Sequence, residues 1–244
     1  MCKVFAVASG KGGTGKTTVT AGLSSALALM GKRVCAIDAD IGLSNLDLAL
    51  GLQDKVVFDL FDLVCGRAER EDVLIRHPDT DGLYFIAAPS EREQIDPEAL
   101  RAEIEKLSED FDYIFIDCCA GLGSGFEMSA HAASCALVVS TPDTPCLKDS
   151  ARAADCFFRE GITDVRLVLN RVRPKMIKKG NAANVDESMD RIGLPLVGLI
   201  FDDERVITAF NRCEPLMLKQ KKGAAADIRD IARRLEHIPV RPRI

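Results

Sequence analysis

The sequence predicts an α/β protein whose doubly wound, mostly parallel sheet is flanked by helices. Three observations lead to this fold class: apolar runs of strand length recur along the chain, amphipathic segments separate them, and the connections are short. Most of these runs are apolar at every position, as in strands that helices cover on both faces. In chain order, the predicted strands are 3–8, 33–38, 83–87, 113–117, 136–140, 166–170 and 196–200.

Four of the segments between the strands have clear helical patterns. They span residues 17–30, 97–108, 147–159 and 225–236. Asp96 and Pro97 predict the start of the second helix, since aspartate caps an N-terminus well and proline fits the first helical position. Gly31 predicts the end of the first helix, because glycine adopts the left-handed conformation that often ends a helix. Strands and helices that alternate in this way predict one domain.

The composition is that of an ordinary globular protein and excludes several other classes. Apolar residues make up 47% of the 244 residues and charged residues 28%, which fits neither a disordered chain nor collagen. The net charge of −5 disfavours a dedicated nucleic-acid coat. No apolar run approaches the roughly 18 residues of a membrane-spanning helix. The N-terminus enters an apolar strand directly, so we expect no signal peptide.

The nine cysteines could indicate a disulfide scaffold or a metal cluster. Their number is odd, the chain is large and no C-x-x-C spacing occurs. We therefore expect reduced thiols in a cytoplasmic protein, most of them as small residues of the core.

The loop after the first predicted strand matches the phosphate-binding pattern G-x-x-x-x-G-K-[ST]. Its glycines allow the backbone N–H groups to point at phosphate oxygens, and the N-terminal end of the next helix favours negative charge. Lys16 would meet the β- and γ-phosphates, and the Thr17 hydroxyl would ligate Mg²⁺. The residues expected to contact the nucleotide here are Gly10, Gly12, Gly13, Thr14, Gly15, Lys16, Thr17 and Thr18.

A second lysine inside the loop, Lys11, makes the pattern more specific. The run K-G-G-T-G-K-T over residues 11–17 resembles the MinD/ParA family of deviant Walker A P-loop ATPases, and the resemblance extends over almost the whole chain. In that family the extra lysine reaches across a nucleotide-sandwich dimer to the partner's phosphates. The resemblance implies that Lys11 acts in trans, beside Lys16, on ATP bound in a homodimer.

Two carboxylates, Asp38 and Asp40, lie at the end of the second predicted strand. Alternate residues of a strand face the same side, so these side chains would repel each other without a cation such as Mg²⁺ or lysine nearby. The run D-A-D-I-G-L-S-N-L-D over residues 38–47 resembles the first switch of the family. By that resemblance Asp40 orients the attacking water, Asp38 supports Mg²⁺ and the loop lysines, and Asn45 lines the phosphate site or the dimer face.

The fourth predicted strand ends in Asp117, as a Walker B strand does. Asp117 would hold Mg²⁺ directly or through water, and Gly121 follows where a sensor of the γ-phosphate would lie. The family reads D-[ST]-P-[AP]-G here, whereas this chain reads D-C-C-A-G, and the missing proline removes a φ constraint. An iron–sulfur cluster at Cys118 and Cys119 would need another cysteine from a different loop, and the sequence offers no convincing one.

Later segments resemble the family's nucleotide-side features less closely. Asp149 matches the position of an acid that, in MinD-like members, pairs with the extra loop lysine when no dimer is formed. The sequence equally allows Asp149 to be an acid in the first turn of a helix, where the helix dipole favours negative charge. Asn170 and Arg171 end the sixth strand at the family's adenine contact, where an amide can pair with the adenine edge. Residues 202–206 and 211–216 resemble its P-E-D-x-x-V and S-N-x-G-E-P segments, with departures that leave the base-side contacts less defined.

The order of the motifs resembles MinD-like members most, since Gly42 replaces the glutamine of the ParA pattern D-x-D-x-Q. The resemblance implies a Mg²⁺-dependent ATPase that dimerises with ATP, separates with ADP and positions a cellular structure, the division site being favoured. An activator or effector of MinC or MinE type is the implied partner. The alternatives are a flagellar-number ATPase, a ParA-type partition ATPase and a nucleotide switch without turnover. DNA binding through the basic residues of 171–179 and 219–222 is disfavoured but left open, because such a run is more often a solvated loop.

The C-terminal end bears on membrane binding. MinD-like proteins carry a flexible linker and a basic amphipathic helix there, whereas two prolines prevent a regular helix in residues 237–244. Two arginines and a few aliphatic residues would give weak attraction to acidic lipid. We therefore expect one ATPase domain over residues 1–236, a short tail, and a cytoplasmic protein with at most weak or indirect contact to the inner face of the cell membrane.

Overall fold

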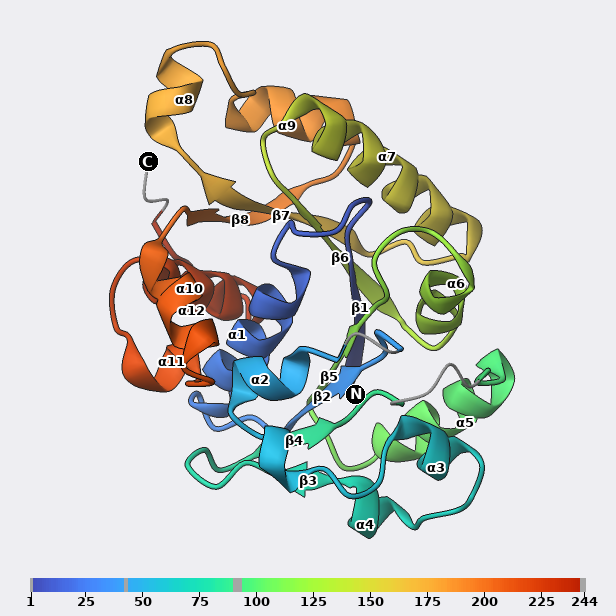
Figure 1. Ribbon diagram of the computed structural model, residues 1–244. Coiled ribbons are helices and arrows are strands. Elements are labelled where there is room, and N and C mark those ends of the chain that lie inside the picture. The colour runs from blue at the N-terminus through green and yellow to red at the C-terminus, as the bar shows by residue number, and fades with distance from the viewer. Residues whose placement is uncertain (1, 42–43, 90–93, 242–244) are drawn as a thin grey trace.

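The computed structural model describes residues 2–41, 44–89 and 94–241, and these form one eight-stranded sheet (Figure 1). The order across the sheet is β3-β4-β2-β5-β1-β6-β7-β8, and every neighbouring pair is parallel except β3 and β4. The strands are β1 (Lys3–Ala8), β2 (Val34–Asp38), β3 (Ile75–Arg76), β4 (Leu83–Ile86), β5 (Tyr113–Asp117), β6 (Cys135–Ser140), β7 (Val165–Val172) and β8 (Leu196–Phe201).

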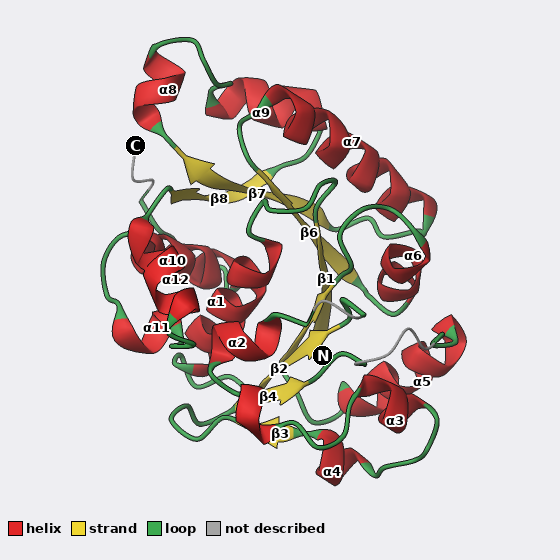
Figure 2. Ribbon diagram, in the orientation of Figure 1, coloured by secondary structure: helices red, strands yellow, loops and turns green. Residues whose placement is uncertain are grey.

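Helices cover both faces of the sheet (Figure 2). One layer contains α1 (Lys16–Ala28), α2 (Leu46–Leu50), α10 (Glu204–Asn211), α11 (Leu216–Lys219) and α12 (Ala224–Leu235). The opposite layer contains α3 (Leu60–Val64), α5 (Pro97–Leu107), α6 (Ser124–His131), α7 (Thr144–Arg159) and α9 (Val185–Ile192). Three short helices complete the described chain: η1 (Gln53–Lys55), α4 (Arg70–Val73) and α8 (Pro174–Lys178).

The predicted fold class is confirmed, and the predicted strands recur within two residues of their expected ends. Asp96 caps α5 by accepting a hydrogen bond from Ala99 N–H at 3.1 Å, and Gly31 adopts a φ of +86° after α1. The antiparallel strand β3 was not predicted, because its two residues are too short to produce a periodic pattern.

The prediction for the cysteines was wrong in one respect. All nine are free, but only Cys35, Cys118 and Cys135 are buried. Cys65 is exposed and the other five are partly exposed. Hydrophobicity alone overestimated their burial, because several lie in loops and on helix surfaces at the edge of the core rather than on strands.

Helix α1 is the rigid support of the site, because it is enclosed on almost every side. Its residues from Val19 to Ala28 are all buried between the sheet and α12. Gly22 allows this close packing: a Cβ atom there would lie 2.8 Å from Ile228 Cδ1 of α12. Burial of this kind fixes the helix axis, and with it the direction of the N–H groups at its N-terminus.

The carboxyl ends of four parallel strands lie at the same edge of the sheet. These ends carry the loop after β1, Asp38 of β2, Asp117 of β5 and Asn170 of β7. Ligands of open α/β sheets bind at this edge, where the chain connections change direction. None of the helices in the described ranges has both the length and the apolar character needed to cross a lipid bilayer.

Candidate phosphate-binding site

The loop between β1 and α1 has the backbone conformation that its glycines permit. Gly13 and Gly15 have φ angles of +84° and +92°, in the left-handed region. The first hydrogen bond within α1 runs from Val19 N–H to Gly15 O at 3.0 Å. The preceding N–H groups of the helix therefore have no helical partner and are available to an anion. These are the N–H groups of Lys16, Thr17 and Thr18.

Behind this loop, the Asp117 carboxylate accepts hydrogen bonds from three side chains of α1. Lys16 Nζ donates to one carboxylate oxygen at 2.9 Å and Thr20 Oγ1 to the same oxygen at 3.0 Å, while Thr17 Oγ1 donates to the other at 2.7 Å. Burial lowers the pKa of Lys16, but the adjacent Asp117 carboxylate outweighs burial, and the net pKa is raised. Lys16 therefore stays charged where a polyphosphate would bind.

Asp38 lies directly beside Asp117, because the two are register partners on β2 and β5. Its Oδ1 accepts a hydrogen bond from Asp40 N–H at 2.9 Å. Its Oδ2 accepts from Ser44 Oγ at 3.1 Å and from Leu46 N–H at 3.1 Å. The Asp38 carboxylate thus holds Asp40, Ser44 and Leu46 of the first switch segment by hydrogen bonds. Burial and then the charge of Asp117 raise the pKa of Asp38 to about 6.

These residues fit a bound Mg²⁺ ion and a polyphosphate. Two adjacent buried carboxylates repel each other when both are ionised, and a bound divalent cation would reduce this repulsion. A threonine hydroxyl and a carboxylate at 2.7 Å form a ligand pair typical of Mg²⁺ in P-loop proteins. In addition, the buried Thr14 Oγ1 has no hydrogen-bond partner in the described part of the chain. A phosphate oxygen would supply one.

Asp40 lies at the mouth of this cluster rather than in its interior. Its Oδ2 is 4.0 Å from Lys16 Nζ, and its side chain is 20% exposed. Burial raises the pKa of Asp40, with Lys16 opposing the shift. On the neighbouring segment, Cys119 Sγ donates a hydrogen bond to Ala39 O at 2.9 Å. Residues 117–121, which we call the second switch segment, are therefore joined to the first switch segment next to Asp40 in this structure.

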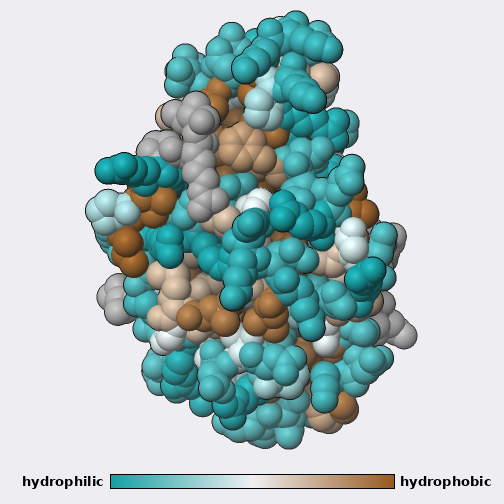
Figure 3. Space-filling model, turned by 90° about the vertical axis from the view of Figure 1, so that its left-hand side faces the viewer, coloured by the Kyte–Doolittle hydropathy of each residue, from teal (hydrophilic) through white to brown (hydrophobic). Residues whose placement is uncertain are grey.

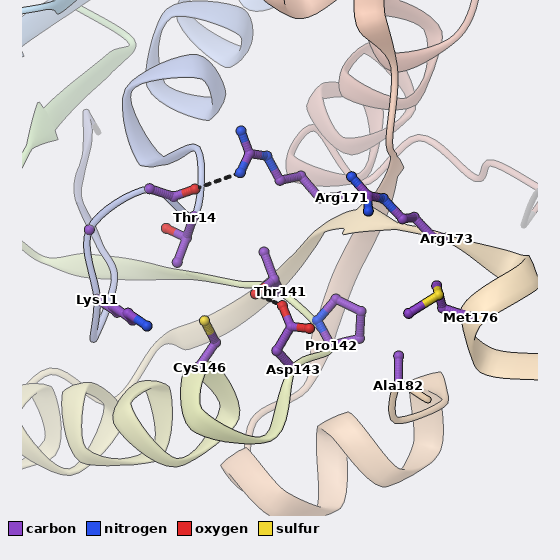
Figure 4. A pocket seen from close by; sticks show the side chains of 12 residues that line it. Lys11, Thr14, Thr141, Pro142, Asp143, Cys146, Arg171, Arg173, Met176 and Ala182 are labelled. Carbon is purple, nitrogen blue, oxygen red and sulfur yellow. Dashed lines mark hydrogen bonds between the residues drawn. The ribbon is translucent and has the colours of Figure 1, made fainter. Parts of the chain in front are cut away.

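Lys11 lines a cavity of about 280 Å³ on the outer side of the loop (Figure 4). Thr14, Asp143, Cys146 and Arg171 line the same cavity, and the Lys11 side chain extends from the loop towards Cys146. Within the described ranges, Lys11 forms no salt bridge. Its ammonium group thus has no ion-pair partner among the residues that the structure describes.

The first-turn interpretation of Asp149 was wrong. Helix α7 begins at Thr144, three residues before the predicted start, and its first turn contains no acidic residue. Asp149 Oδ1 lies 3.6 Å from Arg152 Nη1, one turn farther along the helix, and within the described ranges no salt bridge joins Asp149 to Lys11. The backbone of Asp149 does approach the loop, because a Cβ atom at Gly10 would lie 2.2 Å from its carbonyl.

Asn170 and Arg171 both contact the phosphate loop from the end of β7. Asn170 Nδ2 donates to Thr14 O at 2.7 Å, and Arg171 Nη1 donates to Gly13 O at 3.0 Å. Asn170 also lines a second cavity, of about 300 Å³, on the far side of the loop. An adenine contact by this amide remains a prediction. The observed partners of the amide are two backbone groups, Thr14 O and Arg171 N–H.

The two segments expected near the base lie in different places. Residues 202–204 and 206 line the second cavity together with Thr18 and Ile207. Residues 214 and 216 line a much smaller cavity of about 20 Å³ between α1 and α10. The carbonyl of Cys213 would lie 2.9 Å from a Cβ atom at Gly51. The 211–216 segment therefore packs against the α1–α2 layer, while the 202–206 segment forms a wall of the base-side cavity.

Asp203 holds this wall in place. It caps α10 by accepting from Arg205 N–H at 3.1 Å, and it accepts from Ala224 N–H at 2.9 Å at the start of α12. Burial opposes its ionisation, but the hydrogen bonds from Arg205 and Ala224 outweigh burial and lower the pKa of Asp203. Ionised Asp203 therefore stabilises the fold above the ordinary aspartate pKa, and this contribution is lost as the pH falls below that value.

The variant Asp203→Ala is expected to lower the free energy of unfolding by about 1–3 kcal/mol at neutral pH, because it removes a cap and a second bond. The loss should begin to shrink below about pH 4, where the aspartate of the unfolded chain takes up a proton, and shrink further as the pH falls through the lower pKa of folded Asp203. Urea denaturation at pH 7 and pH 3.5 measures both effects. Asp203→Asn, which keeps one acceptor, should lose less at pH 7, and an equal loss in both variants would contradict this account.

Two contributors to the site were not predicted from the sequence. Thr20 lies one helical turn after Lys16 and donates to Asp117, so the i, i+4 spacing on α1 could have identified it. Cys119 was noted without a role, and its bond to Ala39 depends on a meeting of segments 80 residues apart that no local pattern encodes. Gly42, which replaces the ParA glutamine, lies outside the described residues. In the described ranges, no group of three or more His, Cys, Asp or Glu side chains could hold a metal ion.

Comparisons with known proteins identify the family of the chain. Residues 5–216 match the family model described as the CobQ/CobB/MinD/ParA nucleotide binding domain. The septum site-determining protein MinD of Bacillus subtilis is 37% identical over 246 residues, which cover 98% of this chain and 92% of the relative. The MinC:MinD cell division protein complex of Aquifex aeolicus matches with a TM-score of 0.93 and 33% identity, covering 100% of this chain and 99% of that one. MinD of Pyrococcus horikoshii complexed with Mg-ADP matches with a TM-score of 0.87 and 29% identity over 97% and 96% of the chains.

The fold and the loop together define a P-loop ATPase with a second lysine in its phosphate loop. The chain belongs to the CobQ/CobB/MinD/ParA family of nucleotide-binding proteins, and the relatives named above are MinD proteins.

Proposed function

We propose that this protein is an ATP-driven dimerising switch that positions the site of cell division. The observation that carries the proposal is the arrangement of Lys11, Lys16 and Asp40 around one phosphate loop. Lys16 is bound to Asp117 inside the site, whereas Lys11 lies in an outer cavity without a salt bridge in the described ranges. A lysine in that place is available to a second copy of the chain. The likeness to septum site-determining MinD proteins supports the division role.

Within this function, each group of site residues has a separate task. Gly10, Gly12, Gly13, Thr14, Gly15, Lys16, Thr17 and Thr18 would bind the phosphates, while Thr17, Asp38 and Asp117 would hold Mg²⁺. When bound, Mg²⁺ neutralises charge on the phosphates as the bond to the γ-phosphate breaks. Asp40 would accept a hydrogen bond from the attacking water and align it. Lys11 of one protomer would stabilise the charge that develops in the site of the other. Asn170 and Arg171 would support the phosphate loop from the end of β7, where they bond to Thr14 O and Gly13 O.

The γ-phosphate would control the partner surface through the two switch segments. Asp38 organises the first segment, and the bond from Cys119 to Ala39 joins it to the second. A γ-phosphate that accepts hydrogen bonds from N–H groups of either segment would move both segments together and complete a dimer surface. We propose that residues 1–236 form this switch as one domain, with 237–244 as a tail.

A partner of MinC type is proposed for the ATP-bound dimer, because a MinC:MinD complex is among the similar structures. Contact with the inner face of the cell membrane is proposed to be weak or to depend on that partner. Figure 3 views the face that α10 and α11 help to form, where hydrophilic residues dominate and hydrophobic ones form small, separate groups. Such a surface gives little apolar area for insertion into lipid.

The proposed function is tested by sedimentation of the protein with its MinC-type partner and with anionic liposomes, each with Mg-ATP and with Mg-ADP. We expect co-sedimentation with the partner only in Mg-ATP, and little sedimentation with liposomes in either nucleotide. Binding to duplex DNA that requires ATP and falls steeply with salt would instead assign the protein to a partition function. Equal co-sedimentation with the partner in Mg-ATP and in Mg-ADP would contradict the proposal that ATP switches the protein between two states.

A further inference from the structure

We propose that Asn170 and Arg171 form a clamp that fixes the orientation of two peptide groups in the phosphate loop. The inference rests on the nucleotide site of the proposed function and gives these residues a positioning role there. It differs from an adenine contact, in which the same side chains would touch the base. We call the pair the Asn170–Arg171 clamp.

The clamp holds the carbonyl groups of two consecutive loop residues. Asn170 Nδ2 donates to Thr14 O at 2.7 Å, and Arg171 Nη1 donates to Gly13 O at 3.0 Å, the bond drawn in Figure 4. The two clamp residues are themselves joined, because Asn170 Oδ1 accepts from Arg171 N–H at 2.9 Å. Asn170 is buried, so its bonds are shielded from water.

Peptide geometry links these bonds to phosphate binding. In a planar trans peptide, the C=O and the following N–H point in opposite directions. A clamp on Gly13 O therefore turns Thr14 N–H away from the end of β7, and a clamp on Thr14 O does the same for Gly15 N–H. N–H groups held towards one side of a loop form a concave site for anions. The clamp can thus prepare the loop without touching its ligand.

Two local features are explained by this arrangement. Arg171 has a φ of +53°, a left-handed conformation that costs free energy in residues other than glycine and persists where contacts enforce it. Gly15 is required for close approach, because a Cβ atom there would lie 2.2 Å from Asn170 Nδ2. A side chain at position 15 would push the Asn170 half of the clamp away from the loop.

Arg173 offers a matched control for Arg171. Both arginines line the outer cavity beside Lys11 and the base-side cavity, and both carry the same charge. Arg173 Nε, however, is bound to Asp202 Oδ2 at 2.7 Å, with no bond to the loop. Removing Arg173 therefore changes the charge of the cavity without changing the clamp.

The test measures ligand affinity by calorimetry in Mg²⁺ buffer, together with amide hydrogen exchange of loop residues 10–18 in the protein without nucleotide. The ligands are tripolyphosphate, ATP and AMP. Arg171→Ala should weaken tripolyphosphate and ATP by about the same factor, on the order of tenfold for one charged hydrogen bond, and AMP much less. Exchange in the loop should become faster. Arg171→Lys should restore part of the affinity, and Arg173→Ala should leave the hydrogen exchange of the loop as in the wild type.

Arg171→Gly should give the same losses as Arg171→Ala while relieving the positive φ, which protects the test against a variant that fails to fold. If ATP and AMP weaken equally while tripolyphosphate does not, Arg171 contacts the base and the clamp is wrong. If tripolyphosphate weakens with unchanged exchange in the free protein, Arg171 contacts the phosphate directly, and the clamp is again wrong. Absence of all nucleotide and tripolyphosphate binding in the wild type would overturn the proposed function first, and the clamp with it.

Discussion

The variant Asp40→Ala is expected to hydrolyse ATP at least ~100-fold more slowly than the wild type, because it loses the carboxylate proposed to align the attacking water. Binding of ATP should change little, since the bonds of Lys16 and Thr17 to Asp117 do not involve Asp40. Release of phosphate under steady-state conditions and calorimetry with Mg-ATP measure the two effects. Asp54→Ala provides the control, because it removes an exposed carboxylate on η1. Normal turnover in Asp40→Ala would contradict the assignment of the water-aligning residue.

The variant Lys11→Ala is expected to lose hydrolysis by a similar or larger factor, about 10³-fold if Lys11 acts as arginine fingers do. The physical reason is that the charge developing on the γ-phosphate would lack its contact from the partner protomer. Binding of ATP to the monomer should be retained, because Lys16 and the N-terminus of α1 are unchanged. The rate of ATP hydrolysis is measured for Lys11→Ala and for the control Lys148→Ala, which removes the charge of an exposed lysine on α7 and should keep normal turnover.

Mixing the two inactive variants separates action in trans from action in cis. In a mixed dimer, the Lys11→Ala protomer keeps Asp40 and receives the intact Lys11 of the Asp40→Ala protomer. One of two sites is then complete, and activity should return to about a quarter of wild type if the protomers associate at random as symmetric dimers do. No recovery in the mixture would place Lys11 in the site of its own protomer.

The fold was predictable because its signals are local. Continuous apolar runs identify the strands of a sheet covered on both faces, and Asp96, Pro97 and Gly31 mark helix ends through backbone chemistry alone. The start of α7 was placed three residues late, because Thr144 and Pro145 begin the helix before its apolar periodicity does. β3 has only two residues and depends on its pairing with β4, which sequence periodicity does not encode.

The phosphate loop was predictable for the same reason, since one short run contains its glycines and lysines. The contacts that orient this loop were not. Asn170 and Thr14 are separated by 156 positions, and Cys119 and Ala39 by 80, so only the packed sheet brings them together. The sequence indicated which residues bear chemistry, while the tertiary structure determines what each one touches.

The central claim, an ATP-driven change from monomer to dimer, is tested most directly by light scattering of the Asp40→Ala protein, which should retain bound ATP. The account predicts a mass of twice 26.5 kDa in Mg-ATP and of 26.5 kDa in Mg-ADP. A mass of 26.5 kDa in both nucleotides, under conditions where calorimetry confirms bound ATP, would contradict it.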